Sequence, residues 1–206
     1  MEVRTTTTGR PVAGAQVRIV SPETGEDVPA GTRGEIVYRG WSTFDGYYND
    51  PERTAEVIDE DGWFHSGDLG VVDEEGRLSF HGRLKDMLKV GGENVAAAEV
   101  EGYLLTHPAV LMAQVVSAPD ARYTEVAAAF VQMQPEAEVT EEELIDFCLG
   151  SIATFKVPRY VRFVDEWPMS GTKIKKYVLR ELIAKELADK GITEAPKLRS
   201  NQTLSG

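Results

Sequence analysis

Two charged residues in the first half of the chain have the type and setting that can hold a sugar or a phosphate. Asp68 follows Gly67 in a predicted tight turn, and an ionised carboxylate offers two acceptor oxygens to neighbouring hydroxyls such as those of ribose. Arg83 follows Gly82 at the end of a predicted strand, and its fork of N–H donors suits ribose oxygens or phosphate. Taken alone, the same residues also fit a surface turn and an exposed ion pair.

Two further features can approach an anionic or extended ligand. Gly91 and Gly92 lack a Cβ, so the backbone there can approach a ligand closely, although most such pairs are simple turns. Lys173, Lys175 and Lys176 form a short cationic run in an acidic chain. That run is typical either of an anion site or of the solvated start of a helix.

The overall composition excludes several classes of function. The chain has 206 residues and a net charge of -12, which makes it a poor nucleic-acid binder because phosphate neutralisation needs clustered cations. Cys148 is the only cysteine, so no intrachain disulfide can form, and it lies in an apolar helical pattern typical of a buried thiol. The three histidines lack a metal-ligand spacing. Without an apolar leader or a membrane-length apolar run, we expect a cytoplasmic protein.

The pattern along the chain predicts two regions of different structure. Up to Arg83 it predicts mainly strands, at 16–20, 34–40, 63–65, 70–73 and 78–82, with a short helix at 50–57 capped by Asp50. After Arg83, helices are predicted at 98–105, from Thr140 in a capping-box pattern, and at 177–187. Strands are predicted between those helices, at 110–116, 126–133 and 161–164.

The predicted fold class is therefore α+β, in two parts and a tail. Residues 1–83 form a small, mostly β region, and residues 84–190 form a compact α+β domain. Residues 191–206 form a polar tail that we expect to be poorly ordered beyond Glu194.

Three motifs together resemble the adenylate-forming ligases, a superfamily that includes acyl-CoA synthetases, luciferases and peptide-synthetase adenylation domains. They are His-Ser-Gly-Asp-Leu-Gly at 65–70, Gly-Arg-Leu-Lys-Asp with the following Gly-Gly-Glu-Asn-Val at 82–95, and Pro-Met-Ser-Gly-Thr-Lys-Ile at 168–174. The resemblance covers roughly residues 9–187. Within the superfamily, the chain is most similar to the branch of the acyl-CoA synthetases, or fatty-acid CoA ligases. The resemblance implies a function in joining a carboxylic acid to AMP and then to a thiol.

The resemblance assigns a role to each candidate residue. It implies that Asp68 and Arg83 contact the nucleotide, and that Lys85 is the hinge about which a mobile C-terminal domain rotates. It places Gly91 and Gly92 along the channel for the pantetheine arm of CoA.

The same resemblance makes Lys173 the catalytic lysine, whose ammonium stabilises negative charge at the α-phosphate. The loop before Lys173 is one residue shorter than the usual pattern. Lys175 and Lys176 therefore remain alternatives for the catalytic lysine.

We expect this chain to be the C-terminal part of an ATP-dependent acyl-CoA synthetase, because no Gly/Ser/Thr-rich phosphate loop precedes the motifs. Residues 1–83 would be the last β subdomain of the large domain. Alone, the chain is expected to be inactive and to hold no tightly bound cofactor or metal. Its partners would be the N-terminal portion of the same enzyme, CoA and a carboxylic acid of the fatty type, with ATP, AMP and Mg²⁺ acting in the full-length enzyme. The alternatives are a stand-alone module that binds CoA or a partner, and a decayed remnant without activity.

Overall fold

The computed structural model describes residues 7–199 and divides into two compact units, Met1–Lys85 and Asp86–Gly206. The division falls two residues beyond the boundary predicted after Arg83. The predicted α+β fold class is confirmed, and the structure shows several antiparallel sheets together with helices.

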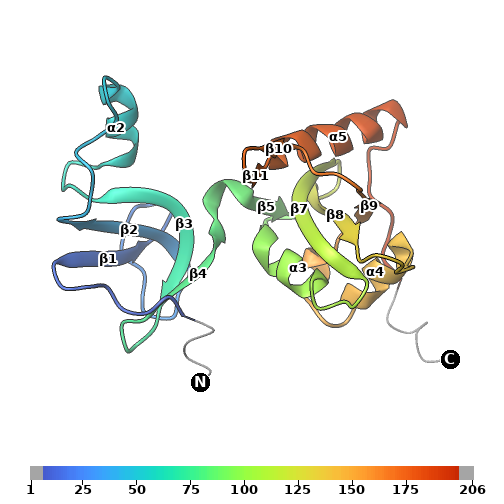
Figure 1. Ribbon diagram of the computed structural model, residues 1–206, viewed down its shortest axis with the longest axis horizontal. Coiled ribbons are helices and arrows are strands. Elements are labelled where there is room, and N and C mark those ends of the chain that lie inside the picture. Colours follow the sequence, from blue (N-terminus) through green and yellow to red (C-terminus); the bar gives the residue numbers. More distant parts are fainter. Residues whose placement is uncertain (1–6, 200–206) are drawn as a thin grey trace. The chain divides into compact units, whose positions relative to one another are not determined.

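Unit 1 is a four-stranded antiparallel sheet in the order β1-β2-β3-β4 (Figure 1). Its strands are β1 (Ala15–Val20), β2 (Gly34–Gly40), β3 (Phe64–Val72) and β4 (Leu78–Arg83). The helix α2 (Pro51–Val57) begins after Asp50, whose Oδ1 accepts the N–H of Arg53 at 3.0 Å. A carboxylate at that position satisfies one of the N–H groups that a helix start leaves unpaired.

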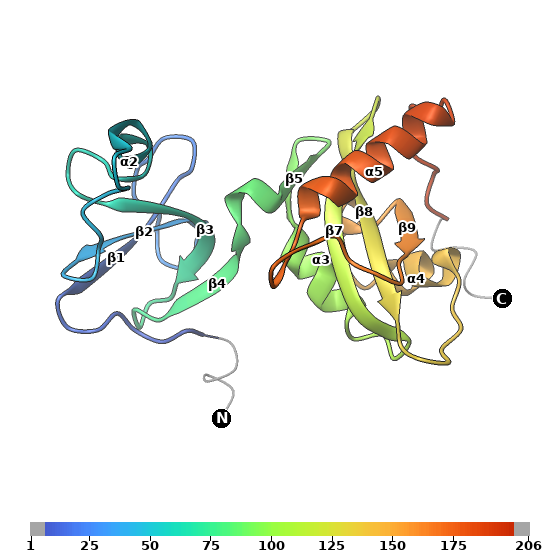
Figure 2. The same ribbon diagram turned by 45° about the horizontal axis from the view of Figure 1, so that its top comes forward.

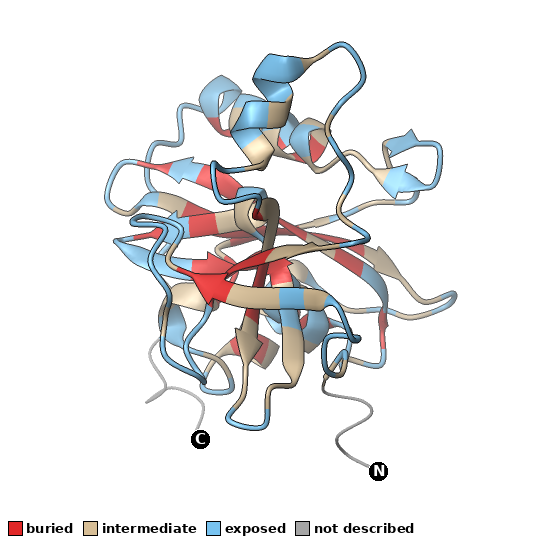
Figure 3. Ribbon diagram, turned by 90° about the vertical axis from the view of Figure 1, so that its left-hand side faces the viewer, coloured by how far each residue is buried: buried red, intermediate tan, exposed pale blue. Residues whose placement is uncertain are grey.

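The buried cluster of unit 1 is small and centres on Trp63. Val20 and Val37 pack with it, and the guanidinium groups of Arg18 and Arg39 lie 4.7 and 4.5 Å from the centre of its ring. Figure 3 shows buried positions mainly on strands and helices, whereas the connecting loops are largely exposed. The buried residues of unit 1 therefore lie mainly on its sheet, and Gly67 lies within one of the sheet's strands, β3.

Unit 2 is built on a second sheet in the order β6-β5-β8-β7, with β9 pairing in parallel with β8. Its strands are β5 (Met87–Val90), β6 (Glu93–Ala96), β7 (Val110–Asp120), β8 (Thr124–Met133) and β9 (Tyr160–Phe163). A two-stranded hairpin consists of β10 (Met169–Ser170) and β11 (Lys173–Ile174). The helices are α3 (Ala97–Leu104), α4 (Glu141–Cys148) and α5 (Lys176–Asp189), with the short 3₁₀ turns η1 (Leu84–Asp86), at the junction between the units, and η2 (Thr154–Lys156).

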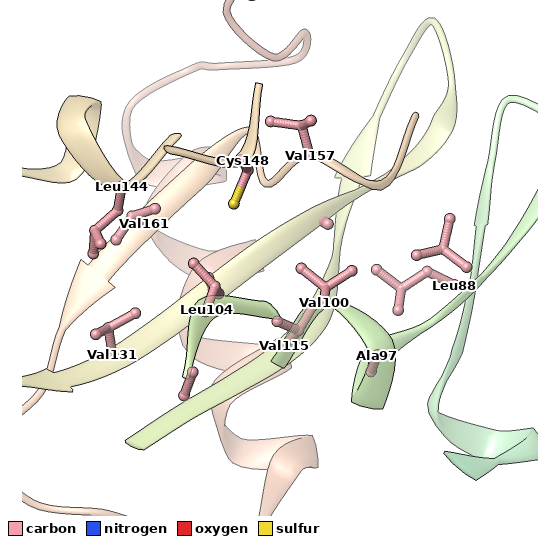
Figure 4. Packing of buried hydrophobic residues seen from close by; sticks show 14 of the residues in the cluster. Leu88, Ala97, Val100, Leu104, Val115, Val131, Leu144, Cys148, Val157 and Val161 are labelled. Carbon is pink, nitrogen blue, oxygen red and sulfur yellow. The ribbon is translucent and has the colours of Figure 1, made fainter. Parts of the chain in front are cut away.

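The alternation of side chains along β7 and β8 separates two apolar layers on opposite faces of this sheet. One layer joins Val115 and Val131 to Leu104 of α3 and to Leu144 of α4, as Figure 4 shows. The other layer lies under α5, which crosses β7 and β8 in Figure 2, and contains the buried side chains Val116, Ala118, Phe130, Leu179, Ile183 and Leu187. Both faces of the sheet are therefore covered by helices.

Cys148 lies in the first of these layers and is fully buried. Desolvation raises the pKa of its thiol to about 12, so the thiol stays protonated and unreactive at neutral pH. The thiol contributes to packing rather than to chemistry.

Some elements differ from the sequence prediction. The two short strands expected around the Gly67 turn are one strand, β3, and the strand expected at 110–116 continues to Asp120. Residues 191–199 belong to unit 2: Ala195 is buried and the N–H of Ala121 donates to the carbonyl of Thr193 at 2.8 Å. The rest of the expected tail, residues 200–206, and the first six residues of the expected β region lie outside the described residues.

Candidate functional site

Asp68 and Arg83 face each other directly across β3 and β4. Nε of Arg83 donates to Oδ1 of Asp68 at 2.9 Å, and the side chains are 49% and 28% exposed, respectively. The structure thus joins the two residues that the sequence proposed for nucleotide contact. Both keep solvent-accessible surface from which further hydrogen bonds to a ligand can form.

The segment of β3 that carries Asp68 is held by hydrogen bonds to the neighbouring strand β2. The N–H of Gly67 donates to Oε1 of Glu35 at 2.9 Å, and Oγ of Ser66 donates to the carbonyl of Ile36 at 2.6 Å. The same Ser66 oxygen accepts the N–H of Asp68 at 3.0 Å. Gly67 has φ +68°, in the left-handed region that glycine tolerates best.

Sequence reasoning missed Glu35. It assigned residues 34–40 a structural role only, although one signal was present, since the charged Glu35 directly precedes the apolar residues Ile36 and Val37 of the same strand. A carboxylate in that setting has to find hydrogen-bond donors when the strand is buried.

An open cleft of about 320 Å³ lies beside this segment of β3 in unit 1. Ser66, Gly67, Arg83, Leu84 and Lys85 line it. The predicted hinge residue therefore shares a surface hollow with the predicted nucleotide contact Arg83. A hollow with a guanidinium and an ammonium among its lining residues suits an anionic or polyhydroxyl ligand.

In unit 2, Gly91 and Gly92 form the turn between β5 and β6. Their φ values are +59° and +91°. The N–H of Gly91 donates to the carbonyl of Tyr123 at 2.9 Å, and a Cβ added to Gly91 would lie 3.1 Å from the Tyr123 ring. A Cβ added to Gly92 would have no described atom within 4 Å. Gly91 therefore packs against the fold, whereas Gly92 faces open space.

Lys173 is exposed on the hairpin β10–β11. Ser170 pairs with Lys173 and Met169 with Ile174, so Gly171 and Thr172 make a two-residue turn, with Gly171 at φ +58°. A glycine with positive φ at the first position of such a turn matches the twist of a hairpin. The loop that is one residue shorter than the family pattern thus forms a regular, tight hairpin, on which Lys173 is exposed.

The two alternative lysines have different surroundings. Nζ of Lys176 lies 2.6 Å from Oε1 of Glu101 and 3.9 Å from Oδ2 of Asp86, and the Lys176 side chain is 18% exposed. Lys175 precedes α5, and its N–H donates to the carbonyl of Pro168 at 2.7 Å. The ammonium of Lys176 is therefore engaged inside unit 2.

The candidate residues fall into two sets, one in each unit. Asp68, Arg83 and Lys85 belong to unit 1, and Gly91, Gly92 and Lys173 belong to unit 2. Among residues 7–199, no group of His, Cys, Asp and Glu side chains is arranged to hold a metal ion. The described residues therefore do not fit a resident Mg²⁺. Within the same part of the chain, no helix is both long and apolar enough to cross a membrane.

Comparison with known protein families gives two matches. Residues 99–173 match the AMP-binding enzyme C-terminal domain, and residues 1–48 match the AMP-binding enzyme family. A curated relative from Bacillus subtilis, the putative acyl-CoA synthetase YngI, is 47% identical over 86% of this chain and 33% of its own length. The zebrafish mitochondrial medium-chain acyl-CoA ligase ACSF2 is 42% identical over 84% of this chain and 28% of its own length. The chain thus spans about a third of the length of these curated relatives.

Solved structures give a consistent result. ATP-bound MatB from Rhodopseudomonas palustris is similar over 88% of this chain and 36% of its own, with a TM-score of 0.82 and 35% identity. The anthranilate CoA ligase AuaEII, solved with anthranoyl-AMP, is similar over 88% of this chain and 36% of its own, with a TM-score of 0.79 and 34% identity.

Proposed function

Because this chain belongs to the adenylate-forming, AMP-binding enzymes, in the branch of the acyl-CoA synthetases, we propose that it serves as the C-terminal part of an acid–thiol ligase. That enzyme converts a carboxylic acid, ATP and CoA to acyl-CoA, AMP and pyrophosphate. The observation that carries the proposal is the pairing of Asp68 with Arg83, which itself lines a hollow in unit 1.

In the first half-reaction, a carboxylate oxygen of the acid attacks the α-phosphorus of ATP. The new P–O bond forms as the bond to the β-phosphate oxygen breaks, and pyrophosphate leaves. Asp68 accepts hydrogen bonds from the ribose hydroxyls, and Arg83 orients the Asp68 carboxylate while contacting the nucleotide. The ammonium of Lys173 stabilises the negative charge that develops at the α-phosphate, and its exposed position on a hairpin supports that role.

In the second half-reaction, the sulfur of CoA attacks the acyl carbon. The C–S bond forms, the C–O bond to the phosphate breaks, AMP leaves and the thiol proton goes to solvent. Gly91 and Gly92 form a turn along which the pantetheine arm passes. The open space beside Gly92 supports this role.

Lys85 is proposed as the hinge between the two half-reactions. It is the last residue of unit 1 and lies in η1, a short 3₁₀ turn of the kind often found at connections. Rotation about a few backbone angles at such a position can exchange one set of unit 2 residues for another at the active site. Lys173 would serve adenylation, and the turn at Gly91 and Gly92 would serve thioester formation.

The acid is proposed to be a medium- or long-chain fatty acid. Glu93 and Asn94 after the Gly-Gly pair resemble the corresponding residues of medium- or long-chain fatty-acid ligases or related carboxylic-acid ligases, and the zebrafish relative is named a medium-chain ligase. The other partners are CoA, ATP and the N-terminal portion of such an enzyme. The chain alone is proposed to be inactive, because its sequence contains no Gly/Ser/Thr-rich phosphate loop ahead of the motifs.

A hybrid enzyme tests this proposal. In the hybrid, this chain replaces the aligned segment of the zebrafish ligase, and the control is that ligase without the segment. We expect the hybrid to form octanoyl-AMP and then octanoyl-CoA, and the control to form neither. A folded hybrid that binds ATP yet makes no octanoyl-AMP would favour a decayed remnant. Binding of CoA by the chain without any adenylation in the hybrid would favour a stand-alone binding module.

A further inference from the structure

Glu35 is one of three buried polar or charged residues in the described part of the chain, with 8% of its surface exposed. Both of its carboxylate oxygens are used. Oε1 accepts the N–H of Gly67 at 2.9 Å, and Oε2 lies 2.9 Å from Nδ1 of His65. A carboxylate oxygen accepts in such a contact, so the contact is a hydrogen bond in the His65 tautomer that carries a proton on Nδ1. The Glu35 side chain on β2 thus contacts the two residues of β3 that flank Ser66.

The pairing of β2 with β3 explains why a side chain is needed there. Val37 pairs with His65 and Glu35 pairs with Leu69, so Ile36 on β2 faces three residues of β3, numbered 66–68. Backbone pairing is interrupted over this bulge. Bulges of this kind re-aim a side chain and leave backbone groups that need other partners.

Side chains on both strands, β2 and β3, supply those partners. Glu35 accepts the Gly67 N–H, and Ser66 links the Ile36 carbonyl to the Asp68 N–H. The bond to Glu35 is charge-assisted and partly shielded from water, which makes it the stronger of these anchors. Asp68 is the residue that the bulge presents toward Arg83.

We propose that Glu35 is a positioning residue of the nucleotide site, which holds the bulge at Gly67 so that Asp68 meets the ribose. This inference rests on the proposed function of Asp68. It adds a residue that touches neither the ligand nor Asp68 itself and acts through the backbone of Gly67.

The chemistry of the carboxylate predicts how substitutions rank. Glu35→Gln keeps an oxygen that can accept the Gly67 N–H, and its amide can donate to the other tautomer of His65. Glu35→Ala leaves the Gly67 N–H without that acceptor, and Glu35→Asp withdraws the carboxylate by one methylene group. We expect AMP to bind about tenfold more weakly to the Ala and Asp variants, the loss of one hydrogen bond to a charged group. The Gln variant should bind within about twofold of the wild type.

The test uses the full chain labelled with ¹⁵N and titrated with AMP, followed by NMR signals of residues 66–69 and of Arg83. Hydrogen exchange of the Gly67 amide is measured on the same samples. Glu74→Ala, a change at an exposed carboxylate in the turn between β3 and β4, is the matched control and should leave both readouts unchanged.

The inference is supported if Glu35→Ala and Glu35→Asp speed Gly67 exchange and weaken AMP binding while Glu35→Gln restores both. If Glu35→Ala unfolds unit 1, the comparison of Glu35→Asp with Glu35→Gln tests the inference instead. Wild-type AMP affinity in the Asp variant overturns the positioning role alone. If the NMR signals near Asp68 in the wild-type chain do not change when AMP is added, the ribose role of Asp68 is overturned, and this inference with it.

Discussion

The two glycines of the β5–β6 turn provide a test that separates folding from channel function. Gly92→Ala introduces a Cβ with no described atom within 4 Å, so its main folding cost is the positive φ of +91°. That cost is about 1–2 kcal/mol for a non-glycine residue, or a fall in Tm of about 4–8 °C for a unit of this size. Gly91→Ala has a smaller backbone cost, because its φ of +59° lies within the left-handed region, but its Cβ would lie 3.1 Å from the Tyr123 ring, and we expect the cost of this tight contact to exceed the backbone difference. Gly91→Ala should therefore destabilise unit 2 more than Gly92→Ala.

The functional effect is expected to follow side-chain bulk at Gly92. In the hybrid enzyme, Gly92→Leu has nearly the same backbone cost as Gly92→Ala but places a large side chain where the pantetheine arm is proposed to pass. We expect Gly92→Leu to slow thioester formation by about 10²-fold, because displacement of a reacting group by about 1 Å has effects of that size. Adenylation should stay within about twofold of the unsubstituted hybrid.

The assay measures the two half-reactions separately at a temperature where all variants are folded. ATP–pyrophosphate exchange reports adenylation, and octanoyl-CoA formed from supplied octanoyl-AMP reports thioester formation. Equal thioester rates for the Leu and Ala variants would refute the channel role of Gly92. Equal loss of both half-reactions in the Leu variant would show that the effect is structural.

Three further predictions concern the hinge, a buried carboxylate and the isolated chain. Lys85→Pro should slow thioester formation more than adenylation in the hybrid, because proline locks φ at the proposed hinge; equal loss of both would contradict the hinge. Asp120 is buried, and desolvation raises the pKa of its carboxyl group. Hydrogen bonds from three backbone N–H groups, of which that of Ala195 contributes most, lower this pKa by more, so that it lies below its usual range. Its stabilising effect is therefore complete above the unfolded pKa of about 3.9 and is lost as pH falls through the lower folded value. Asp120→Asn should lower the free energy of unfolding by about 2 kcal/mol at pH 7, and in urea titrations the gap to the wild type should shrink below about pH 4; a constant gap would contradict this. The isolated chain should show no pyrophosphate exchange above that of its Lys173→Ala variant, and a clear excess would show that it adenylates alone.

Much of the architecture could be predicted because local sequence signals agree with the fold. The capping box formed by Thr140 and Glu143 begins α4 as expected, with Oγ1 of Thr140 accepting the Glu143 N–H at 3.1 Å. The apolar periodicity of residues 177–187 marked α5 within one residue of its observed start. The resemblance to the adenylate-forming ligases, drawn from three motifs, is confirmed.

The features that escaped prediction depend on contacts between distant residues. Glu35 and Gly67 are 32 positions apart, and only the irregular pairing of β2 with β3 brings them together. Likewise, no local signal in the polar sequence around Ala195 predicts that its N–H donates to Oδ2 of Asp120 at 2.6 Å. The roles of the site residues, including Asp68, stay predictions because they require substrates.

The pairing of Lys176 with Glu101 bears on the identity of the catalytic lysine. Its short contact inside unit 2 would have to break before Lys176 could reach a phosphate, and removing one partner of a poorly exposed ion pair is costly. Lys173 has no such constraint among the interactions described for it, and it lies on a tight hairpin. This difference supports Lys173 as the catalytic residue.

The most direct measurement is therefore the rate of ATP–pyrophosphate exchange in the hybrid enzyme for Lys173→Ala, with Lys175→Ala and Lys176→Ala as matched variants. We expect Lys173→Ala to lose about 10²–10³-fold in adenylation while thioester formation from supplied octanoyl-AMP is retained, because the charge is needed only as it develops at the α-phosphate. The other two variants should keep adenylation within about tenfold. Near-normal exchange in Lys173→Ala, with loss in Lys175→Ala or Lys176→Ala, would contradict the assignment and place the catalytic lysine further along the chain.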